Sequence, residues 1–244
     1  MKIFDCHLHI EQGLDNYNII TERKNVIFNH IESYRKYSDS LMPSDTISLI
    51  FDYKNHFEYI KNLVEERTIN ALKIHSRIQK IRLFDYDKLY DRFQIIANKD
   101  LPVIIDSFYY GSDYEVQPNM AKSIEMIKMF PNTKFIIAHA GGIKVMEYFL
   151  HMKNLENVYF ELSLSLAYLR YASVFQDYKA LLKFGNYDKI LFGTDYPFIN
   201  PKQQLSTFLH IAKELKIPDK DLQKILYDNA KSIFTFEPLT RHGY

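Results

Sequence analysis

Two histidines near the start of the chain, His7 and His9, have the spacing of a metal-binding pair. They stand in the segment DCHLHI, directly after the apolar beginning of a predicted strand. Side chains two positions apart point to the same face of a β-strand, so both imidazoles can reach one ion. Imidazole nitrogen is a common ligand of zinc and other transition metals. Two hydrogen-bonded core histidines could have the same spacing, so a metal site needs support from elsewhere in the chain.

Three later segments repeat this arrangement, an apolar strand-like run that ends in a residue able to bind metal or to move a proton. LPVIID ends in Asp106, KFIIAH in His139 and KILFGTD in Asp195. Taken singly, each could be an ordinary turn or capping residue at the end of a strand. Together with the histidine pair, the four strand ends predict one shared active-site mouth.

These residue types could activate water for hydrolysis. A divalent ion with three or four protein ligands and one open position lowers the pKa of its bound water to about 7. Asp195 could take a proton from that water and pass it to the leaving group, while His139 could polarise a substrate carbonyl. Lys73 and His75 share a face of another predicted strand, and Arg77 just beyond could grip a carboxylate. We therefore expect Asp195 and His139 to be catalytic and His75 and Arg77 to bind substrate.

The elements that must position these residues alternate between short apolar runs and amphipathic stretches. This alternation is typical of successive strand–helix units and not of a sandwich or a helical bundle. Eight strands are predicted, near residues 2–8, 25–31, 45–51, 69–75, 101–106, 134–139, 157–162 and 189–194. Helices are predicted at 54–66, 85–99, 119–130, 143–153, 172–184, 201–216 and 219–231. Asp85 and Asn119 are the expected N-caps, and Gly185 the expected stop after its helix.

The expected fold is α/β, a (β/α)8 TIM barrel that forms a single domain over residues 1–244. The sequence has no internal repeat and no linker rich in proline, glycine or serine. Active sites of such barrels lie at the C-terminal ends of the strands. The candidate residues of the first, fifth, sixth and eighth predicted strands all fall there.

Composition excludes several other classes of protein. The net charge is +1, from 31 basic and 30 acidic residues, so no strong field favours nucleic acid or an anionic membrane. The apolar runs are too short to span a membrane. Cys6 is the only cysteine, which excludes an intramolecular disulfide and fits a buried thiol in a reducing cytoplasm. The expected partner is a small-molecule substrate, for a chain that acts alone or as a homo-oligomer.

The motifs resemble those of the amidohydrolase superfamily. The resemblance is to the branch that holds aminocarboxymuconate-semialdehyde decarboxylase, related benzoate-type decarboxylases and pyrone-dicarboxylate lactonase. The matching pieces are DCHLHI at 5–10, ALKIHS at 71–76, LPVIID at 101–106, FIIAHAGG at 135–142, VYFELS at 158–163 and ILFGTDYPF at 190–198. The combination of the paired histidines, AHAGG and FGTDYP is the specific part of this resemblance.

The resemblance implies a metal site made by His7, His9 and Asp195, with His139 as a further ligand or a catalytic group. At Asp106 the family usually has a metal-binding histidine. A carboxylate can also bind Zn²⁺ or Mn²⁺, so Asp106 is kept as an expected ligand. One divalent ion is expected, zinc first and manganese or iron as alternatives, and a metal-free site stays open because the branch has metal-free members. The superfamily also has two-metal sites bridged by a carbamylated lysine, for which Lys73 is the candidate.

Three functions are consistent with these observations. The first is a metal-dependent hydrolase that cleaves a C–O or C–N bond of a small ester, lactone or amide. The second is a nonoxidative decarboxylase, a lyase acting on an unsaturated or aromatic acid held by Arg77. The third is a catalytically inactive barrel with a binding role, which the departure at Asp106 leaves open. Glu161, at the end of the seventh predicted strand, and the aromatic loop 108–118 are further candidates for the mouth of the barrel.

Overall fold

The chain folds into a barrel of eight parallel strands, which follow one another around the sheet in sequence order. The computed structural model describes residues 1–11, 13–97 and 101–235. The strands are β1 (Phe4–Leu8), β2 (Arg23–Phe28), β3 (Thr46–Ile50), β4 (Ala71–Ile74), β5 (Val103–Asp106), β6 (Phe135–Ala138), β7 (Val158–Glu161) and β8 (Ile190–Leu191). Backbone hydrogen bonds from Cys6 N to Phe192 O and from Asp195 N to His7 O join β1 to the segment after β8. All eight predicted strands and the predicted (β/α)8 barrel are confirmed.

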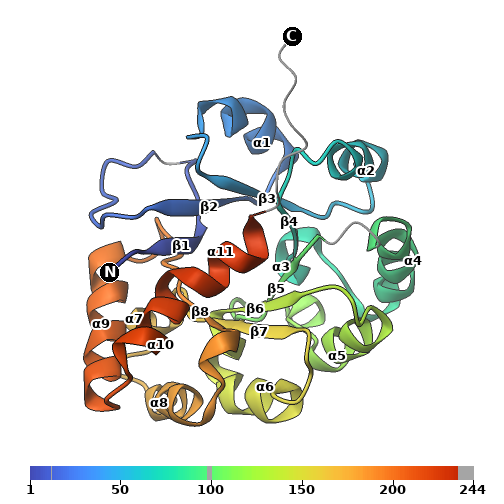
Figure 1. The fold of residues 1–244 in the computed structure, drawn as a ribbon. Coiled ribbons are helices and arrows are strands. Elements are labelled where there is room, and N and C mark those ends of the chain that lie inside the picture. The colour runs from blue at the N-terminus through green and yellow to red at the C-terminus, as the bar shows by residue number, and fades with distance from the viewer. Residues whose placement is uncertain (12, 98–100, 236–244) are drawn as a thin grey trace.

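Helices surround the barrel, as Figure 1 shows. They are α1 (Ile31–Tyr37), α2 (Phe57–Glu65), α3 (Ser76–Gln79), α4 (Tyr86–Ile96), α5 (Met120–Met129), α6 (Val145–Met152), α7 (Ser165–Tyr168), α8 (Phe175–Phe184), α9 (Pro201–Glu214), α10 (Asp219–Gln223) and α11 (Asn229–Phe234). The sequence did not predict the short helices α1, α3 and α7. The helix predicted at 85–99 corresponds to α4, and positions 98 and 99 lie outside the described residues.

Of the three helix-end residues expected from the sequence, Asn119 and Gly185 are confirmed and Asp85 as the cap of α4 is wrong. The Asn119 side chain accepts a hydrogen bond from Lys122 N at 3.1 Å, which confirms it as the N-cap of α5. Gly185 follows the last residue of α8, as predicted. Asp85 stands at the start of α4, but its carboxylate accepts from Arg82 N at 2.9 Å and makes no bond to α4. The Asp85 side chain instead caps the 3-10 turn that precedes α4.

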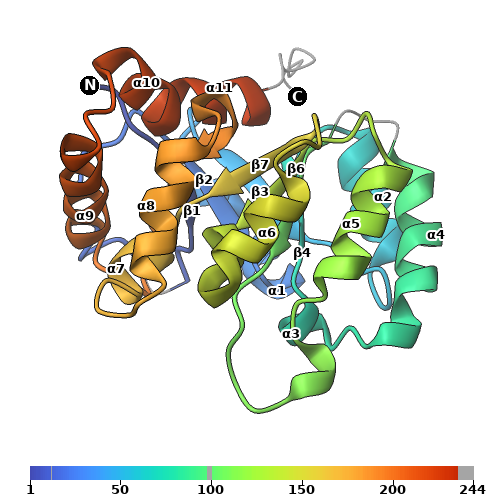
Figure 2. The ribbon, with the colours of Figure 1, turned by 90° about the horizontal axis from the view of Figure 1, so that it is seen from below.

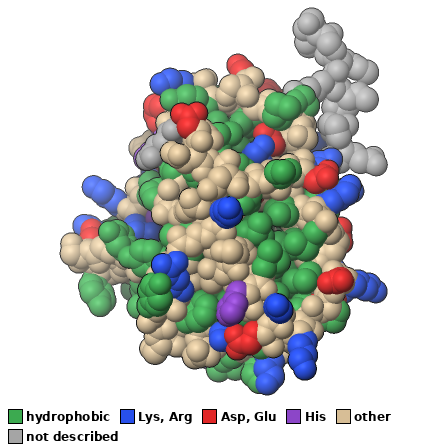
Figure 3. Space-filling view, turned by 90° about the vertical axis from the view of Figure 1, so that its left-hand side faces the viewer, with side chains coloured by type: hydrophobic (Ala, Val, Ile, Leu, Met, Phe, Trp, Pro, Cys, Tyr) green, Lys and Arg blue, Asp and Glu red, His purple; other side chains and the backbone are tan. Residues whose placement is uncertain are grey.

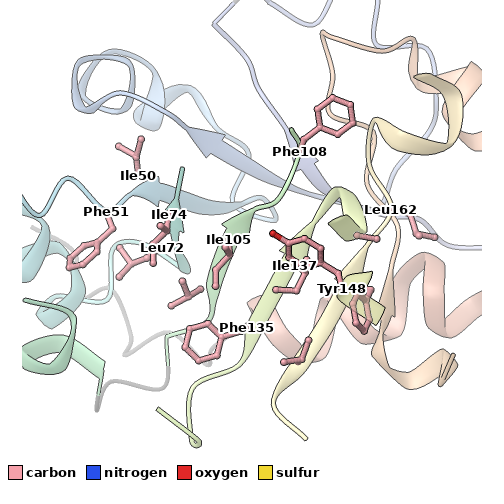
Figure 4. Packing of buried hydrophobic residues seen from close by; sticks show 14 of the residues in the cluster. Ile50, Phe51, Leu72, Ile74, Ile105, Phe108, Phe135, Ile137, Tyr148 and Leu162 are labelled. Atoms are coloured by element: carbon pink, nitrogen blue, oxygen red, sulfur yellow. The ribbon is translucent and has the colours of Figure 1, made fainter. Parts of the chain in front are cut away.

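The core has two parts, one inside the barrel and one around it. Inside, Phe4, Ile104 and Ile136 form a buried cluster with residues of α11. The rings of Phe4 and Phe234 are 5.9 Å apart, so α11 covers the N-terminal end of the barrel. Outside, side chains that point away from β4 to β7 pack under the helices, as Figure 4 shows for Leu72. The N-terminal end of the barrel is thus filled by side chains, and a site can form only at the C-terminal end of the strands.

The C-terminal ends of the strands lie at the end of the barrel opposite α10 and α11. In Figure 2, α3, α7 and the long connection between β5 and α5 lie at this end, away from α10 and α11. Basic, acidic and hydrophobic side chains are interspersed on the molecular face in Figure 3. In the described ranges, no helix combines the length and the hydrophobicity needed to cross a bilayer.

Candidate active site

Three side chains from the first and last strands converge at the mouth of the barrel. Asp195 Oδ1 lies 3.2 Å from His7 Nε2 and 3.5 Å from His9 Nε2. All three residues are buried. Asp195 has a left-handed backbone with φ 61°, and its amide bonds to the carbonyl of His7. The irregular backbone after β8 therefore holds the carboxylate beside the two imidazoles.

The second ring nitrogen of each histidine fixes its tautomer. His7 Nδ1 lies 3.0 Å from Glu161 Oε2, and His9 Nδ1 lies 2.7 Å from the carbonyl oxygen of Ile27. Because a carboxylate and a carbonyl can only accept, Nδ1 carries a proton in each ring, and this tautomer leaves the lone pair on Nε2. Burial lowers the pKa of His7 to about 4, so its ring is neutral at pH 7. Two Nε2 lone pairs and one carboxylate oxygen thus face the same point, and only a cation or a proton donor can satisfy them.

The ends of β1 and β8 are tied together by the buried carboxylate of Asp5. It accepts from His7 N at 3.3 Å, Thr194 N at 2.9 Å, Thr194 Oγ1 at 2.6 Å and Tyr17 Oη at 2.9 Å. The pairing of β1 with β2 changes register after Asp5 and before Leu8. This part of β1 leads from the inner core of the barrel to its mouth. Asp5 therefore sets the histidine pair and the Asp195 segment at a fixed separation.

Glu161, at the end of β7, accepts a hydrogen bond from His7 Nδ1 and so orients the ring. Besides His7 Nδ1, its Oε2 accepts from Ser163 Oγ at 2.7 Å. Burial opposes ionisation, but His7 and these hydrogen bonds outweigh it and hold the pKa of Glu161 below its usual value. A Cβ on Gly193 would lie 2.5 Å from Glu161 Oε1 and 2.9 Å from His7 Cβ. Only glycine leaves room for this pair.

A second cluster surrounds Asp106 across the mouth. Its Oδ1 lies 3.5 Å from His139 Nε2 and 3.7 Å from His75 Nε2, and its Oδ2 lies 3.5 Å from Arg77 Nη2. Burial favours the neutral acid, but His75, His139 and Arg77 hold the pKa of Asp106 well below its usual value. Burial also lowers the pKa of His75 to about 3. Asp106 is thus an ionised carboxylate bound by three nitrogen groups.

His139 has a fixed orientation in this cluster. Its Nδ1 lies 3.1 Å from the Ser163 carbonyl oxygen, to which it donates, so Nε2 faces Asp106. Burial lowers the pKa of the ring, but the hydrogen bond to Asp106 and the charges of Asp195 and Asp106 outweigh it and raise the pKa above the usual value. The backbone φ of 62° turns the side chain into the mouth at the point where β6 ends.

The two clusters line one cavity of about 410 Å³. Its lining includes His9 and Asp195 of the first cluster, His75, Arg77, Asp106 and His139 of the second, and Lys73 of β4, while His7 lies behind them. Aromatic rings form the outer wall: Phe108 and Tyr110 from the loop after β5, Tyr168 of α7, and Phe198. All the sequence-predicted site residues are therefore at this mouth, although Asp106 lies in the second cluster and not in the group formed by His7, His9 and Asp195.

The group of His7, His9 and Asp195 fits a divalent ion. Ligand atoms bonded at about 2.1 Å in tetrahedral or octahedral geometry are about 3.0–3.4 Å apart. The observed separations of 3.2 and 3.5 Å from Asp195 Oδ1 match this spacing. A second group, His7, His139 and Glu161, also has its ligand atoms close together. Since Glu161 already accepts the His7 Nδ1 proton, we interpret this second group as support for the first.

Sequence reasoning missed the roles of Asp5 and Ser163 and gave Glu161 only a minor place. The signal for Asp5 was its position two residues before His7, and that for Ser163 its position two residues after Glu161. Both act through hydrogen bonds to other strands, which no local pattern displays. The thiol of Cys6 is buried and unpaired, as expected.

The structure resembles several known TIM-barrel proteins. An uncharacterised TIM-barrel protein from Bordetella bronchiseptica has 15% sequence identity and a TM-score of 0.73, with 96% of this chain and 98% of that one covered. A probable 2-pyrone-4,6-dicarboxylic acid hydrolase from Acinetobacter baumannii has 14% identity and a TM-score of 0.66, over 97% and 100% of the two chains. A 5-carboxyvanillate decarboxylase from Sphingomonas paucimobilis has 14% identity and a TM-score of 0.57, with 91% of this chain and 80% of that one covered. Because the sequence identities are 15% or lower, these structural similarities show the fold alone.

No curated protein sequence matches the chain. A family model described as "Amidohydrolase" matches residues 52–236, which is most of the chain and includes β4 to β8 with Asp106, His139 and Asp195. Together with the eight-stranded barrel, this match settles the family that the motifs suggested: the chain belongs to the amidohydrolase family.

Proposed function

We propose that the protein hydrolyses a C–O or C–N bond of a small ester, lactone or amide in the cavity at the mouth of the barrel. The observation that carries the proposal is the convergence of His7 Nε2, His9 Nε2 and Asp195 Oδ1 on one point that needs a cation. One divalent ion, with zinc as the first candidate and manganese or iron as alternatives, would be held by these three residues. When bound, such an ion lowers the pKa of its water to about 7.

Asp195 and His139 handle protons and charge in this proposal. Asp195 Oδ1 faces the two histidines, which leaves Oδ2 to accept the proton of the attacking water and to return it to the leaving group. His139 presents Nε2 toward the cavity, and its raised pKa favours the protonated form, which would stabilise the negative charge on the carbonyl oxygen. Asp106 keeps that proton in place, and its position beside His139 makes this role more direct than metal ligation.

The wall of the cavity suits a flat or cyclic substrate. The ring of Phe108 makes edge contacts with His139 and Tyr168, both with centroids 5.7 Å apart, and Phe198 lies edge-on to His9 at 5.9 Å. The Tyr168 and Phe198 rings are exposed, so a substrate ring could stack between them and shed water. The cavity volume of about 410 Å³ suits a small molecule.

Nonoxidative decarboxylation is the second candidate. Arg77 lines the cavity, and its buried Nε has no hydrogen-bond partner among the described residues, so it could bind a substrate carboxylate. Against this, Asp106 already compensates part of the Arg77 charge. The similarity in fold to a decarboxylase and to a probable pyrone-dicarboxylic acid hydrolase is compatible with either reaction.

One screen distinguishes these functions. Protein incubated with Zn²⁺ or Mn²⁺ would be given aromatic and cyclic esters, lactones, amides and carboxylic acids, and both hydrolysis and CO₂ release would be measured. We expect hydrolysis that Asp195→Asn abolishes. CO₂ release that Arg77→Met abolishes would favour the lyase, and no turnover of any compound would favour an inactive barrel with a binding role.

The place of the protein in the cell is a further part of the proposal. We propose the cytoplasm, because the only cysteine, Cys6, is buried as a free thiol. Cell fractionation with an antibody would test this, and recovery from an oxidising compartment would contradict it.

A further inference from the structure

Lys73 reaches into the predicted metal group from the opposite side of the barrel. Its Nζ lies 3.1 Å from His7 Nε2. The side chain is 2% exposed, so its charge is almost fully withdrawn from water. It stands on β4 one residue before the strand ends at Ile74, with its alkyl chain inside the barrel above Ala71. A buried ammonium is stable only where acceptors are close to it, and the acceptor that Lys73 contacts, His7 Nε2, is one of the atoms assigned to the ion.

His7 Nε2 can serve only one of these two cations. The Nδ1 proton is held by Glu161, so Nε2 has a single lone pair. An N–H···N hydrogen bond and a metal–nitrogen bond both lie along that lone pair, the first at about 3 Å and the second at about 2.1 Å. An ion bonded to His7 would therefore lie in the path of the Lys73 hydrogen bond. Ammonium and ion exclude each other at this atom.

Asp106 offers the displaced ammonium a second place. It lies on β5, the neighbour of β4, and both Asp106 and Lys73 line the cavity. Its Oδ2 is buried and makes no hydrogen bond within the described part of the chain, although it lies 3.5 Å from Arg77 Nη2. A carboxylate at this position can accept a lysine, whereas a neutral imidazole could not compensate its charge.

We propose that Lys73 competes with the divalent ion for His7 Nε2: the ammonium fills the metal group in the ion-free protein and moves toward Asp106 when an ion binds. This proposal rests on the proposed function, since it takes the same three residues as the metal ligands. The ion-free site is then already ordered, because Lys73 satisfies the lone pair of His7 Nε2. The cost is a weaker affinity for metal than the three ligands alone would give.

Metal affinity measured without any substrate tests the competition. Protein stripped with a chelator would be titrated with Zn²⁺ and with Mn²⁺ against a chromophoric chelator, for wild type and for Lys73→Met. Methionine keeps the length and apolar body of the side chain and removes the charge. We expect Lys73→Met to bind both ions at least tenfold more tightly than wild type. Lys88→Met, at an exposed position of α4, is the matched control and should match wild type.

Each other outcome overturns the proposal in a recognisable way. Weaker binding by Lys73→Met would mean that Lys73 is itself a ligand, and a carbamate resonance in ¹³C-bicarbonate-labelled wild type would say the same. Equal affinities would remove the competition and leave the metal-dependent function intact. If neither protein bound metal, the competition and the metal-dependent function would both be wrong. Circular dichroism checks the fold, and Lys73→Gln replaces Lys73→Met in the titration if the methionine variant does not fold.

Discussion

Asp106 Oδ1 lies 3.5 Å from His139 Nε2, so a carboxylate from β5 directly faces the imidazole that ends β6. At the position where the family usually has a metal-binding histidine, the chain has a carboxylate that orients His139 and favours the protonated form of its ring. Because the same carboxylate also contacts His75 and Arg77, it links the groups expected to bind substrate to the group expected to stabilise its charge.

The first prediction concerns the pH dependence of hydrolysis in Asp106→Asn. The raised pKa of His139 favours its protonated form, and activity that needs this form is lost as pH rises through that pKa. Removing the Asp106 charge destabilises the imidazolium, so the falling limb of the kcat profile should move to lower pH by about one unit. An unchanged limb would mean that His139 does not titrate in the active range. Asp113→Asn, in the loop after β5, is the control.

The second prediction concerns Glu161. Glu161→Gln keeps the size of the side chain but gives a weaker acceptor for the His7 Nδ1 proton. The group that accepts the other ring N–H of a metal-binding histidine typically contributes about 10–100-fold to metal affinity. We expect a loss of that size in Zn²⁺ titrations, with a normal circular dichroism spectrum. Full retention of affinity would show that Glu161 does not orient the ring of His7.

The third prediction concerns the close packing at Gly193. Gly193→Ala would place a methyl group against Glu161 and His7, and the backbone must shift to relieve the overlap. Overpacking of this kind costs about 1–3 kcal/mol, or a few degrees in Tm for a chain of this size. Thermal unfolding of Gly193→Ala and of Gly111→Ala, where a Cβ meets nothing within 4 Å, separates crowding from backbone strain. A Gly193→Ala protein with the Tm of wild type would argue against crowding.

The fourth prediction concerns the aromatic wall. Phe198→Ala removes an exposed ring beside His9, and a substrate that stacks there should lose about 1 kcal/mol of binding, a several-fold rise in KM. The effect should be larger for aromatic than for aliphatic esters, while kcat changes little. Phe184→Ala, an exposed ring at the end of α8, should leave both constants unchanged. A uniform change for all substrates would mean that the ring shapes the site and does not contact the substrate.

The barrel itself was predictable because its signals are local. Each strand is an apolar run with a polar end, and parallel connections bring those ends together at one rim. For this reason His7, His9, His139 and Asp195 could be placed at one mouth from their positions in the sequence. The strand ends differ by a few residues: β2 was expected at 25–31 and ends at Phe28, where the unpredicted helix α1 follows.

The contacts between strands could not be predicted. Asp5 joins β1 to the segment after β8, because Thr194 and Tyr17, both outside β1, donate hydrogen bonds to its carboxylate. Lys73 reaches His7 across the barrel, and only closure of the sheet brings the two within 3.1 Å. Such relationships depend on strand stagger and side-chain direction, which a spacing pattern does not contain.

The central claim is that His7, His9 and Asp195 together hold one divalent ion. It is tested most directly by mass-spectrometric metal analysis of wild type and of the double variant His7→Ala, His9→Ala, each incubated with Zn²⁺ or Mn²⁺ and then freed of excess ion. We predict close to one equivalent of metal in wild type and almost none in the folded double variant. Wild type without bound metal, or a double variant that keeps a full equivalent, would contradict the account.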